Sequence, residues 1–168
     1  MLPTNSHYYI TGQDYTVDTE YTNGTVLYTH DEYGNVTGTY TFNGWDKSNG
    51  TIENADVEVT GTWTYAEQTV PEYKVTYSWE GLPEDGTTLY DADGNVVTPT
   101  EPADETGLVN GQSYTIDTTY TSATVVYTKD QYGNVNGKYT FSGWDKNDGT
   151  IENADVEVTG TWTYAEQT

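Results

Sequence analysis

Residues 139–164 read YTFSGWDKNDGTIENADVEVTGTWTY, and the second half of this stretch alternates strictly. One face carries Val156, Val158, Gly160, Trp162 and Tyr164, and the other carries Asp155, Glu157, Thr159, Thr161 and Thr163. A period of two with β-branched and aromatic residues predicts a strand with one buried and one solvated face. The first half, residues 139–144, predicts an aromatic partner strand, in which Gly143 would let a ring or backbone approach closely.

The same stretch occurs earlier as residues 40–65, with Trp45 lying 99 positions before Trp144. From residue 50 to residue 69 the two copies are identical. A repeat of this length predicts two tandem domains. We assign residues 1–69 to a first repeat and residues 70–168 to a complete second repeat, joined at a short, polar segment that ends in proline.

The second repeat opens with EYKVTYSW at residues 72–79, where Tyr73, Val75, Tyr77 and Trp79 share one face. The counterpart of this strand in the first repeat would lie before Met1, so we expect the first repeat to lack its first strand. An unpaired strand edge invites pairing with another chain. We therefore expect strand addition to the first repeat, with a tolerated loss or a frayed module as the alternatives.

Further strands are predicted at residues 12–22, 25–29 and 39–45, and residues 81–106 are predicted to be rich in loops. No stretch sustains a period of 3.6 residues, so no helix is strongly indicated. The predicted fold class is all-β, with at most minor helical turns. Two elongated β modules in tandem would then form a rod-like array.

Composition excludes several classes of function. The net charge is −22 with only five Lys and Arg residues, which argues against nucleic acid or an anionic membrane as partner. There is no cysteine, so disulfides and thiolate chemistry are excluded. Hydrophobic residues make up only 33%, but 17 Tyr and five Trp favour a folded β protein over disorder.

The titratable residues do not form a recognisable catalytic motif. The only histidines are His7 and His30, and the second copy replaces His30 by Lys129, which is improbable for a catalytic base. Asp155 and Glu157 lie on the predicted solvent face, without the convergent partner that a glycosidase pair needs. We therefore expect no catalytic residue, no cofactor and no enzymatic activity.

Two acidic loops were weighed as calcium sites. Residues 91–95, DADGN, resemble part of a calcium loop but lack the later bidentate glutamate of an EF-hand. Residues 145–149, DKNDG, place their glycine one position early. Ordinary Asx and glycine turns are the preferred interpretation, so no metal site is expected, and weak calcium binding is the alternative.

Covalent Lys–Asn cross-links, which occur in other surface-protein β domains, are also disfavoured. Lys74 lies in a first strand, but its side chain falls on the solvent face and no Asn follows in the last strand. Lys47 with Asn54, and Lys146 with Asn153, lie within single loop regions, where a bond would constrain little.

The aromatic residues suggest a second class of function, because ring faces on a sheet can bind sugars. Trp144 and Trp162 belong to or adjoin the predicted buried face, so core packing is the better interpretation. Tyr33 and Tyr132, in the YGN turns, are the aromatic residues predicted to be exposed.

The elements YKVTYSW, a proline-rich middle section, YTFSGWDK, DGTIENADV and VTGTWTY together resemble the SHIRT domains. These are near-identical tandem repeats of wall-anchored adhesins of Gram-positive bacteria. A looser similarity extends to internalin-type B repeats and mucin-binding-like repeats. Members of the family often carry a short Leu-rich helical turn after the first strand, and residues 83–104 have no such run.

The resemblance implies a stalk, in which β-rich modules hold a separate ligand-binding head away from the cell wall. Neighbouring repeats of the same chain would be the main partners, and the protein would be extracellular. Met1 is read as an added start, because the chain looks like an internal piece of something longer. The alternative function is a glycan- or host-protein-binding module.

Overall fold

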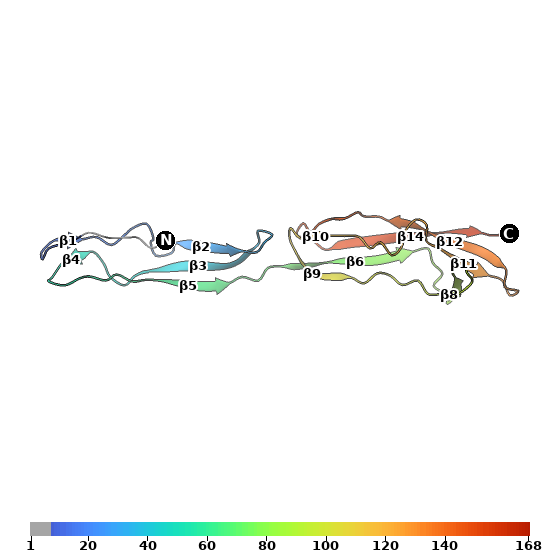
Figure 1. The fold of residues 1–168 in the computed structure, drawn as a ribbon, viewed down its shortest axis with the longest axis horizontal. Helices are drawn as coiled ribbons and strands as arrows, with labels where there is room; N and C mark the ends of the chain where they lie inside the picture. Colours follow the sequence, from blue (N-terminus) through green and yellow to red (C-terminus); the bar gives the residue numbers. More distant parts are fainter. Residues whose placement is uncertain (1–7) are drawn as a thin grey trace. The chain divides into compact units, whose positions relative to one another are not determined.

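The protein is described here by a computed structural model, which covers residues 8–168 and divides into two compact units, Met1–Val70 and Pro71–Thr168 (Figure 1). Within the described residues every regular element is a β-strand, which confirms the predicted all-β class. The helical turns that the prediction allowed do not occur in this part of the chain. It also contains no helix that could cross a membrane.

The second unit is built on one seven-stranded sheet with the order β8-β7-β11-β12-β14-β6-β9. Its strands are Val96–Val97 (β8), Leu89–Tyr90 (β7), Val125–Lys129 (β11), Val135–Trp144 (β12), Val156–Glu166 (β14), Glu72–Glu80 (β6) and Glu105–Val109 (β9). A separate antiparallel pair joins β10 (Ser113–Tyr114) to β13 (Gly149–Thr150). β7, β8 and β13 lie in segments that the sequence predicts to be loops, because two-residue strands leave no alternation to detect.

The pairing of β14 with β6 is parallel, whereas the other neighbours in this sheet are antiparallel. Figure 1 shows the two strands side by side and pointing the same way. Their register runs from Val156 opposite Val75 to Thr161 opposite Glu80. Parallel neighbours require a long connection, and strands paired in this way are usually buried. Here β6 lies inside the sheet, between β14 and β9.

Two clusters of buried side chains form the core of the second unit. One contains Val75, Leu108, Ile151 and Val158, and the other contains Leu89, Val126, Phe141 and Trp162. Val158 is 1% exposed and Trp162 is 3% exposed, as the alternation predicted. Tyr164 departs from the predicted buried face with 51% exposure. It lies beyond the last residue that pairs with β6, and its ring packs against Tyr139 instead.

Two glycines shape the sheet around Phe141. A Cβ atom on Gly160 would lie 2.7 Å from the Phe141 ring and 2.8 Å from Trp144, so the aromatic core requires glycine there. The close approach predicted at Gly143 is wrong, because a Cβ there would meet nothing within 4 Å. Gly143 instead adopts a φ of 118° at the bulge that follows Phe141, a conformation that favours glycine.

The first unit is built on a three-stranded sheet with the order β2-β3-β5. Its strands are Val26–His30 (β2), Val36–Trp45 (β3) and Gly61–Glu67 (β5), and β1 (Asp14–Tyr15) pairs separately with β4 (Gly50–Thr51). The predicted strand at residues 12–22 is therefore wrong beyond Tyr15. The backbone N–H of Val17 donates to the Asn49 side chain instead of to a neighbouring strand.

The identical sequences of the two units fold differently at one place. β14 begins at Val156, but its counterpart β5 begins only at Gly61, so residues 57–60 are not part of a strand. Val59 is half-buried and Val57 is 36% exposed, whereas Val158 is buried. In the second unit this half of the strand pairs with β6. No other described strand pairs with this half in the first unit. Thr60 hydrogen-bonds to Asp46 through its backbone N–H and C=O, but no neighbouring strand holds residues 57–59 extended.

A matched pair of substitutions measures this difference. Ile151 is completely buried, whereas Ile52, at the same place in an identical sequence, is half-buried. We expect Ile151→Ala to destabilise the second unit by about 2–5 kcal/mol, because it leaves a cavity in a packed core. Ile52→Ala should destabilise the first unit clearly less. Hydrogen exchange in β12 and β3, whose peptides differ in sequence, reports on each unit separately.

The unmodified chain provides the control for this comparison. β12 should exchange more slowly than β3, because the sheet around β12 is closed by β6. Equal protection of the two strands in a monomeric chain would show that β6 is dispensable for the unit.

Candidate functional site

His30 and its counterpart Lys129 have different surroundings in the two units. His30 is exposed at the end of β2, and His7 lies outside the described residues. In the second unit the counterpart Lys129 places its Nζ 4.2 Å from the centre of the Tyr90 ring. Such a contact is a cation–π interaction. The position therefore serves to hold β7 against β11.

Three loops share the pattern Asp-x-x-Gly-Asn and one hydrogen-bonding scheme. They begin at Asp31, Asp91 and Asp130. In each, Oδ1 of the aspartate accepts the backbone N–H groups two and four residues later, and Oδ2 accepts the Asn side-chain amide. These bonds hold the pKa of each aspartate below its ordinary value. The loop at residues 91–95 is therefore a self-contained turn in which both carboxylate oxygens are used.

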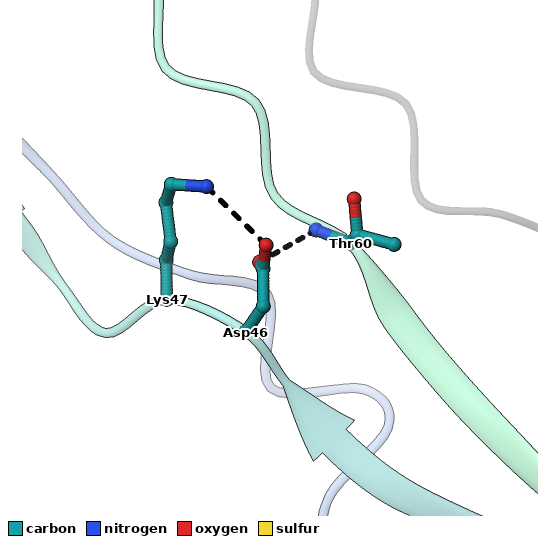
Figure 2. Close-up of polar contacts among 3 residues, drawn as sticks. All are labelled: Asp46, Lys47 and Thr60. Atoms are coloured by element: carbon teal, nitrogen blue, oxygen red, sulfur yellow. Dashed lines mark hydrogen bonds and ion pairs between the residues drawn. The ribbon is translucent and has the colours of Figure 1, made fainter.

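The aspartate of the Gly-Trp-Asp-Lys motif also accepts a backbone N–H, at the end of β3 and of β12. Figure 2 shows the Asp46 carboxylate between the Nζ of Lys47 and the backbone N–H of Thr60. In the second unit Asp145 accepts a 2.7 Å bond from the N–H of Thr159 and lies 3.4 Å from the Nζ of Lys146. The Thr159 bond and Lys146 lower the pKa of Asp145. The motif thus ties the loop to the start of the last strand.

Asp155 and Glu157, the two carboxylates considered for catalysis, have different surroundings. Asp155 is exposed, as predicted, and its Oδ1 also accepts a 3.0 Å bond from the backbone N–H of Lys74. It therefore anchors the first residues of β6. Glu157 is exposed, as predicted. Within residues 8–168 no three His, Cys, Asp or Glu side chains come together in a way that could hold a metal ion.

The lysines singled out in the sequence are engaged elsewhere. Lys47 and Lys146 pair with the adjacent aspartates, not with Asn54 or Asn153. The two asparagines adopt positive φ values of 64° and 58°, which Asn tolerates better than most residues. Lys74 is exposed on β6.

Acidic side chains also protect the outer edge of β6, a role that the sequence analysis missed. The pairing of β9 with β6 ends at Val75, which lies opposite Glu105. The backbone N–H of Tyr77 donates to Asp104 at 3.3 Å, and that of Trp79 donates to Glu101 at 3.1 Å. Both acids lie in the proline-rich segment before β9. Because they are only three residues apart, both can reach the edge of the same strand. They block the edge against pairing with other chains.

The aromatic side chains divide into a buried group and an exposed group. Trp79, Tyr120 and Phe141 surround Trp162, with ring centroids 5.6, 6.0 and 5.2 Å from it. The predicted core role of Trp162 is confirmed, and Trp144 packs against both core clusters. Tyr33 and Tyr132 are exposed, as predicted.

One exposed aromatic feature was not anticipated. Tyr139 and Tyr164 lie directly opposite each other on β12 and β14, with ring centroids 4.9 Å apart. Tyr40 and Tyr65 form the same pair in the first unit, also at 4.9 Å. A Cβ on Gly137 would collide with the Tyr164 ring, so this glycine provides the space in which the ring lies.

The second unit also contains a hollow of about 490 Å³ next to β6. Its apolar lining includes Trp79, Leu82 and Leu89, and Glu84 and Glu101 contribute carboxylates. Glu101 already accepts the N–H of Trp79. The hollow therefore has an apolar wall, and one of its two carboxylates is already hydrogen-bonded to the backbone. Its lining shows no nucleophile hydrogen-bonded to a base.

The hydrogen bonds of Asp145 predict a specific pH dependence. A carboxylate with a lowered pKa stabilises the fold above its ordinary pKa, and this contribution is lost as the pH falls through the folded-state value. Asp145→Asn should therefore lower the melting temperature at pH 7, and the gap to the unmodified protein should narrow as the pH falls below the ordinary aspartate pKa of about 4. Thermal unfolding followed by circular dichroism measures both.

The control for this prediction is Glu157→Gln, which removes the same charge from the exposed face of β14, the strand whose Thr159 donates to Asp145. It should change the melting temperature little at either pH. A gap for Asp145→Asn that is the same at pH 7 and at pH 3 would contradict a role for the ionised carboxylate.

The turn geometry predicts that folding is independent of calcium. A chelator should leave the melting temperature unchanged, because the aspartate oxygens at residues 91 and 130 already accept N–H groups within their own turns. Millimolar calcium should not raise it either. A rise of several degrees on adding calcium, abolished by Asp91→Asn, would show that the loop at residues 91–95 binds the ion.

Comparisons with known proteins identify one family. A search of the curated proteins finds no match. Among solved structures, the chain is similar to Streptococcal High Identity Repeats in Tandem (SHIRT) domains 3-4 from a cell surface protein. The identity is 25%, 99% of this chain and 86% of that one are covered, and the TM-score is 0.41. The family model of the SHIRT domain matches residues 71–165, more than half of the chain. The chain therefore belongs to the SHIRT domain family.

Proposed function

We propose that the chain is a pair of structural repeats from the stalk of a bacterial cell-surface adhesin. Such repeats act as spacers between the cell wall and a separate ligand-binding head. The observation that carries the proposal is the use of the polar side chains. The aspartates with the best-defined contacts close turns or cap strand edges, and none of those described converges with others on a common point.

Family membership and the tandem repeat also support a spacer. The similar solved structure is described as part of a cell surface protein, and extracellular attachment to a Gram-positive cell wall is proposed here for this chain by analogy. The pairing of β3 with β5 repeats that of β12 with β14, and a repeated strand arrangement suits added length better than a single specific site. The net charge of −22 would keep neighbouring copies apart in solution.

The connection between the units favours a stiff spacer over a flexible one. β5 ends at Glu67 and β6 begins at Glu72, so only residues 68–71 join them, and Pro71 restricts the last. A chain this short cannot behave as a flexible coil, and proline stiffens it further. A strand of nine residues spans roughly 30 Å, so each repeat would add several nanometres to a stalk.

Small-angle X-ray scattering tests the spacer role. A compact globule of 168 residues would have a radius of gyration of about 15 Å. We expect a clearly larger value, with a pair-distance distribution extended to one side. A variant with a long Gly-Ser insertion after Thr69 is the matched control, and it should give a broader range of sizes. A compact, near-spherical profile for the unmodified chain would remove the argument for a spacer.

A glycan- or host-protein-binding module is the second candidate, and the exposed tyrosine pairs favour it. Tyr65 is 49% exposed and Tyr164 is 51% exposed, so each unit presents a tyrosine ring at the same place. Aromatic rings of this kind can stack on sugars or on a protein partner. Reproducible micromolar binding on a glycan array that is lost in the double variant Tyr65→Ala and Tyr164→Ala would favour this function over the spacer.

A further inference from the structure

Residues 71–109, which we call the strap, close the sheet of the second unit from both sides. The strap contains β6, β7, β8 and β9. Its β6 pairs with β14 at one edge of the three strands β11-β12-β14, and its β7 pairs with β11 at the other edge. The strap residues Val75, Leu89 and Leu108 are all buried in the two core clusters. The second unit therefore depends on the strap for much of its core.

The first unit contains the same three strands in the same register. The pairing of Tyr40 with Tyr65 and of Trp45 with Gly61 repeats that of Tyr139 with Tyr164 and of Trp144 with Gly160. The part that would contact β6 is residues 50–69, and it is identical in sequence to residues 149–168. A surface with the same sequence and the same strand order offers the same contacts.

The side chains that the strap covers in the second unit are exposed in the first. Leu27 is 50% exposed, whereas Val126 at the corresponding position is 5% exposed. Val59 is half-buried, whereas Val158 is 1% exposed. No other described residue of the first unit pairs with the edge of β5 that corresponds to the β6 side of β14. The first unit thus presents an apolar face and a free strand edge together.

The aromatic partners of the strap are also present in the first unit. In the second unit the ring of Tyr77 lies 5.2 Å from Trp144, and that of Trp79 lies 5.6 Å from Trp162. Trp45 and Trp63 occupy these two places in the first unit and contact Phe42 at 5.1 and 5.0 Å. The corresponding indoles are therefore already held in position by the unit's own core.

The polar contacts of the strap have counterparts as well. Asp155 accepts the N–H of Lys74, and the equivalent Asp56 is exposed in the first unit. The Tyr77 hydroxyl accepts the N–H of Asp117, for which Asp18 is the equivalent residue. An incoming strap would therefore find hydrogen-bond partners for the residues equivalent to Lys74 and Tyr77.

We propose that the first unit is a binding site for a second strap, a polypeptide segment with the sequence pattern of residues 71–109. Its β6 strand adds in parallel beside β5, in the register that places its Val75 opposite Val57 and its Trp79 opposite Gly61. Strand addition of this kind takes affinity from backbone hydrogen bonds and specificity from alternate side chains. The donor is an unoccupied strap of another SHIRT-type repeat.

A second copy of this chain is a poor donor of a strap. The strap of each copy is already packed in its own second unit, where Val75 is completely buried. An intramolecular partner competes at an effective concentration in the millimolar range. One strap moved between two equivalent acceptors gains no contact.

Titration of the full chain, labelled with ¹⁵N, with an unlabelled synthetic peptide of residues 71–109 tests the proposal. We expect one peptide to bind per monomer, with large shifts of the amides of residues 57–61 and slower hydrogen exchange in β3. The amides of β14 should stay unchanged, because that acceptor is occupied. Absence of binding, or shifts in β14 only, would overturn the proposal.

A matched pair of chain variants locates the site. Val59→Asp should weaken peptide binding by at least about tenfold, because it would bury an unpaired carboxylate against the strap. Glu58→Gln, on the opposite face of the same segment, should bind as the unmodified chain does. Equal binding by both variants would overturn the proposed register.

A fused strap keeps the test decisive if the free peptide aggregates. The sequence of residues 71–109 joined ahead of the first unit should slow hydrogen exchange in β3 until it matches β12. An unchanged β3 would overturn the proposal. So would protection of β3 in concentrated, peptide-free chain that appears together with a dimer, because the occupant would then be a second copy.

Discussion

The parallel pairing of β6 with β14 governs how much of the repeat sequence becomes buried sheet. Residues 149–168 and 50–69 are identical, yet Val158 is buried and Val59 is only half-buried. The difference cannot come from local propensity, because the local sequence is the same. It comes from the neighbouring strand, which supplies backbone partners to residues 156–161 and places Val75 against Ile151 and Val158. The burial of Val158 and the length of β14 therefore depend on the pairing with β6 and not on the sequence of β14 alone.

This dependence explains which features could be predicted from the sequence. The alternation over residues 156–162 gave the correct buried face, because β6 covers that half of β14. It failed at Tyr164, two residues later, where β6 has ended and the ring packs on Tyr139 instead. The strand predicted at residues 12–22 failed for a related reason. Its loose alternation had no long partner, and β1 pairs over only two residues with β4. An alternating pattern shows which side chains share a face of a strand, but the neighbouring strand determines how many of them become buried.

For the carboxylates, the sequence did not show which groups each side chain contacts. Asp91 was weighed as a calcium ligand because several oxygens stand close together in the sequence. The structure directs Oδ1 of Asp91 to two backbone N–H groups and Oδ2 to the Asn95 amide. The same pattern recurs at Asp31 and Asp130, which was the available signal for a turn. No such signal existed for Glu101 and Asp104, since capping a strand edge depends on where the proline-rich segment runs.

The positions at which the two repeats differ show what the fold preserves. Asn43 and Ser142, in the bulges of β3 and β12, both hydrogen-bond to a threonine on the next strand, Thr64 or Thr163. Asn49 and Asp148 both accept a backbone N–H from the loop after β1 or β10. At both positions the side chain differs between the repeats, but the hydrogen bond that it makes is retained. Residues 156–161, which pair with β6, show no exchange at all and are identical to residues 57–62 of the first unit. A repeat that must be closed by a strap has the least freedom along this contact.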